Sequence, residues 1–246
     1  MRFTIVADDG ASVEIHDEEF AQRGDLWIAQ DGVDGWDAPA LVRETPIERA
    51  MSDGDLEPLT LTQGAKVFTI HGWCLPPSAA ALAFQKDRLN SLVGKMLTIV
   101  GEDEAGARQM RGYLSDGPAL QTRHTQQGAT FDLTFTCPDP HKYGPEVAYP
   151  VASAYVTVSN AGNCDSWPRV VVTGWVESLS LNLDGRNVRW EGAQEGLEID
   201  FATGEASGGT LSVDNAFPIP PGDHDVGVSA LPRGCSVRLV ARSCWR

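Results

Sequence analysis

The chain has 246 residues, of which 42% are hydrophobic and 22% are charged, and its formal net charge is −15. This length suits one large or two modest domains, and the composition excludes wholesale disorder. The longest apolar run, residues 79–84, is far shorter than the ~20 residues of a membrane-spanning helix. The N-terminus turns acidic too soon for a signal peptide, so we expect synthesis and assembly in the cytosol.

The negative charge is concentrated near the N-terminus. Residues 1–60 carry 15 of the 34 acidic side chains but only 4 of the 19 basic ones. This balance disfavours binding to nucleic-acid phosphates and to anionic lipid headgroups. DNA can still pass beside such a protein without being held by it.

The five cysteines give no sign of a metal site or a disulfide framework. Their number is odd, no C-x-x-C pair occurs, and the five histidines are scattered. In a reducing compartment this pattern is typical of buried free thiols.

Short runs with period-two alternation predict strands throughout the first 137 residues. In residues 65–73, Lys66, Phe68 and Ile70 share one face, and in residues 131–137 every second side chain is apolar. One segment follows a helical spacing instead, with Ser78 as the N-cap and Gly94 as the stop. We expect a mainly β, sandwich-like or barrel-like domain with one helix over residues 79–93.

A domain boundary is predicted near residue 150. Residues 137–145 contain three prolines, which a sheet interior does not accommodate. We therefore expect domains at 1–150 and 151–246. The second has seven or eight short strands and a turn at Asp184 and Gly185, a pattern typical of a β-sandwich or jelly roll.

No residue set points to catalysis or to a cofactor. Asp31, Asp34 and Asp37 could offer oxygens to calcium, but EF-hand spacing is absent and a solvated glycine-rich loop is favoured. No nucleophile elbow or phosphate-binding loop occurs, and no carboxylate pair stands out. We predict no catalytic, cofactor-binding or metal-ligating residues and no enzyme, with an acidic hydrolase as a weakly supported alternative.

Seven tryptophans are present, and they could be core residues, interface anchors or sugar-stacking platforms. Most are expected in the core or at sheet edges. Trp190, which lies between Arg189 and Glu191, is the one that we expect to be exposed.

The order of several motifs along the chain resembles that of the distal tail proteins of long-tailed bacteriophages. The resemblance covers nearly the whole chain, is strongest over residues 128–222 and is weakest over residues 1–60. The residues that carry it are Phe131, Leu133 and Phe135 leading into Cys137-Pro138-Asp139-Pro140, Tyr143-Gly144, Val156-x-Val158-x-Asn160-Ala161-Gly162-Asn163, Trp167-Pro168-Arg169-Val170-x-Val172-x-Gly174, Gly196-Leu197-x-Ile199-Asp200 with Gly204, and Pro220-Pro221-Gly222.

The resemblance implies a structural virion protein of the tail tip. Its N-terminal β-domain would close a hexameric ring around the DNA exit channel, and its C-terminal β-sandwich would be galectin-like and peripheral. The implied partners are further copies of the chain, the tail tube protein, the baseplate hub or tail-associated protein, the tape measure protein and a receptor-binding protein. A carbohydrate-binding module that contributes to host adsorption is the alternative.

A closed ring needs two unlike, complementary patches on each subunit, and we expect them from strand edges and the 20–60 region. Several N-terminal acids are expected to face the channel or its rim, where negative charge would repel DNA. The residues assigned to the interface or channel are Asp31, Asp34, Trp36, Asp37, Glu48, Asp53 and Asp55.

Turn residues are assigned structural roles only. Asp139 and Asn163 are expected to bind the local backbone as Asx turns, and Pro138 and Pro140 to stiffen the exit from the first domain. Gly162 and Gly204 are expected to supply unusual φ values.

Overall fold

The computed structural model describes residues 1–17, 25–43, 45–118, 120–122, 128–232 and 234–246. Residues 20–24 and 44, which belong to the 20–60 region expected to form contacts, lie outside this part. The chain divides into two compact units, residues 1–142 together with Arg246, and residues 143–245. The division comes a few residues before the expected position near 150.

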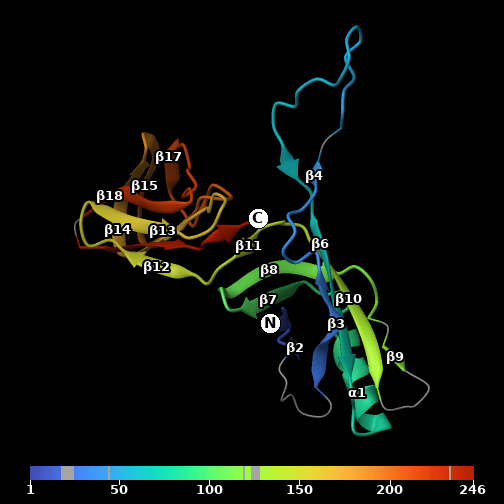
Figure 1. The fold of residues 1–246 in the computed structure, drawn as a ribbon. Coiled ribbons are helices and arrows are strands. Elements are labelled where there is room, and N and C mark those ends of the chain that lie inside the picture. Colours follow the sequence, from blue (N-terminus) through green and yellow to red (C-terminus); the bar gives the residue numbers. More distant parts are fainter. Residues whose placement is uncertain (18–24, 44, 119, 123–127, 233) are drawn as a thin grey trace. The chain divides into compact units, whose positions relative to one another are not determined.

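The first unit is built from strands and one helix (Figure 1). Its elements are β1 (Arg2–Ala7), β2 (Ser12–His16), β3 (Leu26–Asp34), β4 (Val42–Arg43), β5 (Thr62–Gln63), β6 (Lys66–Cys74), α1 (Ala79–Asn90), β7 (Leu97–Asp103), β8 (Gly106–Leu114), β9 (Gln121–Thr122) and β10 (Ala129–Cys137); β11 (Lys142–Tyr143) spans the division.

The main sheet of the first unit closes on itself. Its strands run in the order β8-β7-β1-β2-β3-β6-β10-β9, and β10 also pairs with β8 through Phe135 opposite Leu114. All of these pairings are antiparallel except the single contact between β2 and β3, where His16 lies opposite Trp27. The unit is therefore barrel-like, which is one of the two forms that the sequence left open.

Aromatic side chains fill this barrel. Phe3 and Trp36 meet edge to face at 5.1 Å, Trp36 meets Phe68 at 5.2 Å, and Phe68 stacks on Phe135 at 5.1 Å. Gly101 lies under this cluster, and a Cβ there would come within 2.6 Å of the Trp36 ring. The close approach of Trp36 to β7 thus depends on a residue without a side chain.

Helix α1 begins where the sequence predicted. The Ser78 hydroxyl accepts a hydrogen bond from the Ala81 N–H at 3.2 Å, and Gly94 has a φ of +77°. The α-helix ends at Asn90 rather than 93, because the N–H groups of Leu92 and Val93 bond three residues back in a tighter turn. Within the described residues, no helix is long and apolar enough to cross a lipid bilayer.

The second unit is entirely β in its described residues. Its strands are β12 (Val147–Pro150), β13 (Tyr155–Asn160), β14 (Arg169–Leu183), β15 (Arg186–Asp200), β16 (Glu205–Ala206), β17 (Thr210–Asp214), β18 (Gly222–Leu231), β19 (Ser236–Ala241) and β20 (Cys244–Trp245). β14 is central: its first half pairs with β19, its second half pairs with β18, and β15 follows most of its length. The mainly β fold class is confirmed in both units.

The β14–β15 hairpin turns at Asp184 and Gly185, which have φ values of +50° and +82°. This is the turn that an Asp-Gly pair favours between two strands. Trp190 on β15 is 0% exposed, so the prediction of an exposed Trp190 was wrong. Arg189 and Glu191 point to the opposite face of the strand, whereas Trp190 faces the core beside Leu179 and donates to the Gly208 carbonyl at 2.6 Å.

The turn residues behave partly as expected. Asp139 accepts from the His141 N–H at 3.1 Å, which confirms that Asx turn, and Gly204 has a φ of +71°. Gly162 does not have a positive φ. It is needed because a Cβ there would lie 1.7 Å from the Cys244 carbonyl oxygen. A residue that the sequence analysis did not assign, the buried Asn160, also binds the local backbone, because its amide oxygen accepts from the Gly162 N–H at 3.0 Å.

Candidate functional site: an exposed arm and its base

A long excursion leaves the barrel between β3 and β6. Residues 41–63, here called the arm, are anchored by β4 and β5, where Val42 pairs with Gln63 and Arg43 with Thr62 (Figure 1). Farther out, the Leu56 N–H donates to the Ile47 carbonyl at 2.8 Å, and the Arg49 N–H to the Gly54 carbonyl at 3.1 Å. The arm is therefore a loosely paired ribbon that extends away from the barrel.

The arm carries apolar side chains that the described residues of its own unit do not cover. Met51 is 98% exposed, and the other large apolar residues of the arm are also exposed, namely Leu41, Val42, Ile47, Leu56, Leu59 and Leu61. A run of apolar side chains on a projecting segment is costly in water and marks a contact surface. The arm is thus suited to pack against another molecule.

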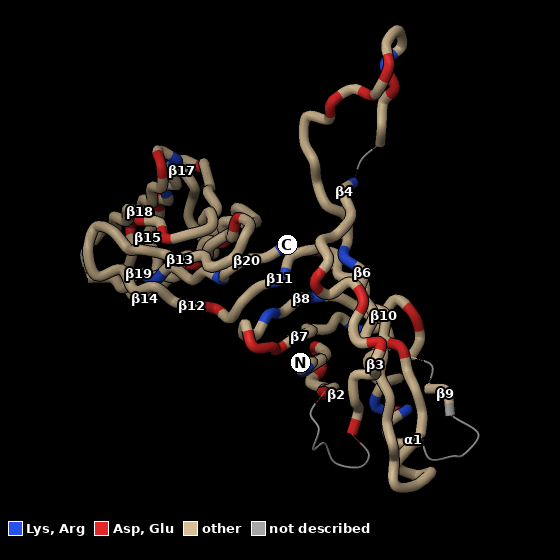
Figure 2. Tube along the Cα trace, in the orientation of Figure 1, with Lys and Arg blue, Asp and Glu red and all other residues tan. Residues whose placement is uncertain are grey.

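Acidic residues accompany these apolar side chains (Figure 2). Glu48, Asp53 and Asp55, which the sequence assigned to an interface, all lie exposed on the arm, where Glu48 and Asp55 form an isolated backbone bridge. Residues 41–63 contain five acids and two arginines. A partner surface with basic and apolar groups would complement this segment.

The other four assigned residues lie at the arm's base. Asp31 and Asp34 are exposed on β3, and Asp37 is exposed in the turn that follows. Trp36 is 2% exposed and belongs to the barrel core, so its indole is not offered to a partner. Its packing between Phe3 and Phe68 instead fixes the turn from which the arm departs.

Two buried lysines hold this turn. Lys66 and Lys142 both donate to the Trp36 carbonyl oxygen, at 2.8 and 3.0 Å, and Lys142 also pairs with Asp37 at 3.1 Å. Burial, aided by the positive charge of Lys142, lowers the pKa of Lys66 to about 8. The alternation in the sequence predicted that Lys66 shares a face with Phe68, and the structure confirms this and shows that the shared face is the buried one.

A cluster of one histidine and two aspartates links three neighbouring strands on the outer face of the barrel, next to the base of the arm. His71 on β6 contacts Asp132 on β10 at 2.7 Å and Asp34 on β3 at 3.3 Å. The hydrogen bond to Asp132 is the main cause of a raised pKa of His71. A cavity of about 260 Å³ lies nearby, lined by residues 38–43 and 64–67 with Gly35.

A second unpartnered apolar surface lies on α1. Ala80, Ala83 and Phe84 face solvent together, whereas Leu82 and Leu89 pack into the barrel core. The Arg88 guanidinium lies 6.0 Å from the Phe84 ring centre. The first unit thus exposes an acidic apolar arm and, at another place, an apolar helix face, here called the outer helix face, next to a basic group.

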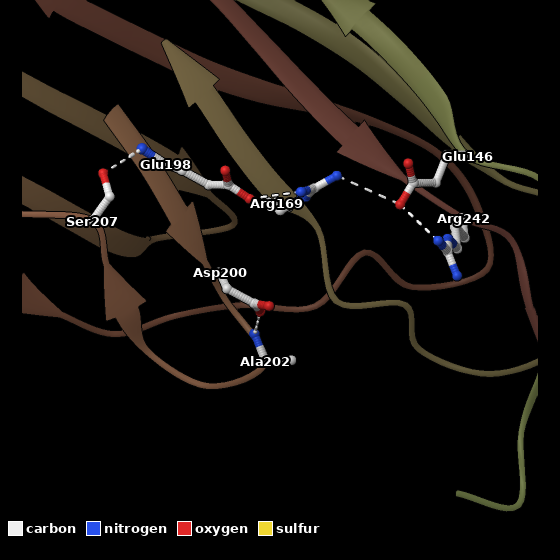
Figure 3. A network of polar contacts seen from close by, with 7 residues as sticks. All are labelled: Glu146, Arg169, Glu198, Asp200, Ala202, Ser207 and Arg242. Atoms are coloured by element: carbon white, nitrogen blue, oxygen red, sulfur yellow. Dashed lines mark hydrogen bonds and ion pairs between the residues drawn. The ribbon is translucent and has the colours of Figure 1, made fainter. Parts of the chain in front are cut away.

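The second unit has a cavity of its own, of about 300 Å³. Figure 3 shows the polar contacts of Glu146, Arg169, Asp200 and Arg242, which are among the residues that line it. Trp167 lies at this cavity and is 47% exposed. Charged residues surround it: Arg169 pairs with Glu198 at 2.6 Å, and Glu146 bridges Arg169 at 3.5 Å and Arg242 at 2.7 Å. An exposed indole beside polar groups is the arrangement that stacks a sugar ring, and the sequence alone did not single out Trp167.

Comparison with solved structures gives matches over nearly the whole chain. The SPP1 Dit protein (gp 19.1), described as a paradigm of the hub adsorption apparatus of phages that infect Gram-positive bacteria, superposes with a TM-score of 0.71 at 16% identity, over 99% of both chains. The chain has the fold of a phage Dit protein. No protein-family model and no curated protein sequence matches it significantly.

Two further matches come from structures of the phage p2 baseplate in its activated conformation, one with strontium and one with calcium. Their TM-scores are 0.54 and 0.51, at 10% identity and over 98% of both chains. The coverage shows that both units, in this order, recur in phage tail proteins. The resemblance stated from the sequence is confirmed at the level of the fold.

Proposed function

We propose that the chain is a structural, non-catalytic component of a phage tail tip, and that copies of it form a ring, hexameric by analogy, that joins the tail tube to the baseplate hub around the DNA exit channel. The observation that carries the proposal is the arm, whose apolar side chains are exposed in the part of the first unit that the structure describes. The Dit fold over the whole chain supports it.

Ring closure needs a head-to-tail contact between two different surfaces. We propose the arm as the first surface and the outer helix face as the second. The arm offers apolar and acidic groups, and the helix offers Phe84 with Arg88 beside it. This pairing joins unlike surfaces and complements their charge, which favours a ring over a two-fold dimer.

The acids of the first unit are proposed to face the channel or its rim. Asp31 and Asp34 on β3 and Asp37 after it are exposed on the barrel. Negative charge on a channel wall repels phosphates and keeps passing DNA from adhering. A ring structure with a neutral or basic bore would contradict this part of the proposal.

The oligomeric state tests the ring. The full chain is purified and its mass is measured by light scattering and native mass spectrometry, alone and with the tail tube or hub protein. We expect one discrete multiple of the subunit mass, six in the proposed ring. A chain that stays monomeric alone and with both partners would overturn the proposal.

Three variants locate the contact. Met51→Ser with Leu59→Ser in the arm, and separately Phe84→Ser on the helix, are each expected to lower self-association at least tenfold, because they remove apolar contact area. Tyr155→Ser is the matched control, since it removes an exposed aromatic ring from the second unit. If the arm variant assembles like the wild type, the arm is not the contact.

Carbohydrate binding by the second unit is a second candidate function, favoured by Trp167 at the 300 Å³ cavity. Titration with bacterial cell-wall glycans, followed by tryptophan fluorescence, tests it. Trp167→Ala is expected to abolish the signal. Trp175→Ala, which removes a tryptophan of similar exposure whose Nε1 donates to Glu177, is expected to retain it. An unchanged response in Trp167→Ala would exclude this cavity.

A further inference from the structure

Two cysteines of the second unit bring their sulfur atoms together. The Sγ atoms of Cys164, in the segment between β13 and β14, and Cys244, on β20, lie 2.7 Å apart, and both side chains are buried. A disulfide bond is about 2.05 Å long, so a small movement would close it. We propose that Cys164 and Cys244 are a modification site, at which the two thiols are oxidised to a disulfide.

The approach of the two residues does not depend on the sulfur atoms. The N–H groups of Asn163 and Cys164 both donate to the Cys244 carbonyl, at 2.9 and 3.3 Å. The Asn160 side chain donates to the Cys164 carbonyl at 2.8 Å and accepts from the Cys244 N–H at 3.1 Å. Gly162 lies against the same carbonyl, where no side chain would fit. The backbone therefore holds the two Cβ atoms in place before any bond forms.

The other three cysteines have different surroundings. Cys74 and Cys137 are buried in the first unit, and burial raises the pKa of both thiols, that of Cys137 to about 12, which disfavours the reactive thiolate. Cys235 is half-buried in the second unit, with its Sγ 3.6 Å from the Pro232 carbonyl oxygen. The sequence predicted buried free thiols; the proposed oxidation concerns one pair among the five.

Oxidation needs access to the two buried thiols. β20 is only two residues long, so local opening of this strand would expose Cys244 together with Cys164. A small-molecule disulfide such as oxidised glutathione is the co-reactant. One protein thiolate attacks it and releases one glutathione thiolate; the second protein thiolate then attacks the mixed disulfide and releases the other. The protein loses two protons and two electrons, and one glutathione disulfide becomes two thiols.

The bond would connect two parts of the cavity at Trp167. Cys164 precedes Ser166 and Trp167 on one side, and Cys244 follows Arg242 on the other, whose carbonyl accepts from the Ser166 hydroxyl. The cross-link would join residues 80 positions apart and fix both walls. The time at which the disulfide forms rests on the proposed function, because a protein made in a reducing cytosol meets an oxidising medium once the particle leaves the host.

Thiol counting tests the proposal on the full-length chain. Protein kept under reductant is compared with protein incubated with oxidised glutathione; each is then unfolded, alkylated with iodoacetamide and weighed. We expect five alkylated thiols before oxidation and three after it, with a cross-linked peptide that contains Cys164 and Cys244. The melting temperature of the second unit is expected to rise by roughly 10 °C on oxidation, because the cross-link restricts the unfolded chain.

Single cysteine variants test which two thiols form the disulfide. Cys164→Ser and Cys244→Ser are each expected to prevent the loss of two thiols, whereas Cys235→Ser still loses two. Five thiols after oxidation, a linkage through Cys235, or a zinc ion that a chelator removes while both thiols stay reduced would each overturn the proposal. Light scattering in both redox states keeps this result separate from the ring, since self-association can fail or succeed independently of the cross-link.

Discussion

Two hairpins of this protein place their apolar side chains in opposite environments, one in a core and the other in water. The β14–β15 hairpin is paired along most of two 15-residue strands and buries alternate side chains, among them Leu181, Val188 and Trp190. The arm forms two residue pairs at its base and a few backbone contacts farther out, and it leaves Met51 and Leu59 exposed to water. The first hairpin therefore finds its partners in its own unit, whereas the arm needs them from elsewhere.

The difference lies in the pattern of the side chains. In β14 and β15 apolar residues alternate with polar ones, so one face can pack on a sheet. In the arm, apolar residues follow no period, and Pro46 and Pro58 remove backbone donors. Such a segment cannot join a sheet of its own unit along its length, but it can lie along a neighbouring surface.

The largest loss of stability is expected for a substitution in the buried β14–β15 hairpin. Trp190→Ala removes a fully buried indole and its hydrogen bond to Gly208, and should lower the free energy of unfolding of the second unit by about 3–5 kcal/mol. Chemical denaturation followed by circular dichroism measures this. Trp175→Ala on the same hairpin, where the indole is half-exposed, should cost about 1 kcal/mol or less. Equal losses in the two variants would contradict the packing.

The next largest loss of stability is expected at the base of the arm. Gly101→Ala introduces a Cβ 2.6 Å from the Trp36 ring and 3.0 Å from the Phe3 ring, and the crowding should cost the first unit about 1–3 kcal/mol. Gly117→Ala, which adds a Cβ in open space, should change stability by less than about 0.5 kcal/mol. Thermal unfolding of the two variants compares them, and no difference would mean that Trp36 is not tightly held.

A smaller, pH-dependent effect is expected at His71. Because its pKa is raised in the folded state above the usual 6.5, the stability it contributes is complete below pH 6.5 and is lost as the pH rises through the folded value. Between pH 6 and pH 8 the wild type should lose up to about 1 kcal/mol more than His71→Gln, an amount limited by the exposure of both aspartates. Parallel pH profiles would show that the cluster does not stabilise the fold.

The smallest change in stability is expected for substitutions in the arm. Met51→Ser with Leu59→Ser should change the unfolding free energy of the dilute monomer by less than about 0.5 kcal/mol, because neither side chain is buried. Equilibrium denaturation at a concentration below assembly measures it. A loss of about 2 kcal/mol would mean that the arm folds back onto its own unit.

Local patterns predicted the strands, the helix start and the Asp184 turn because neighbours along the chain determine them. Trp190 was misjudged from its charged neighbours, although adjacent residues of a strand point to opposite faces. The hydrogen bond from Lys142 to the Trp36 carbonyl could not be predicted, since the two residues are 106 positions apart in the sequence. The pairing of Cys164 with Cys244 likewise depends on the fold and not on spacing.

The two lysines at the Trp36 carbonyl have a mechanical consequence. Lys66 follows the arm, and Lys142 is the last residue before the chain leaves the barrel. Mechanical force on the arm and force on the chain after Lys142 would therefore both reach the Trp36 carbonyl oxygen. The Trp36 ring packs between Phe3 and Phe68, so such a force would spread into the barrel core instead of separating one strand from its neighbour.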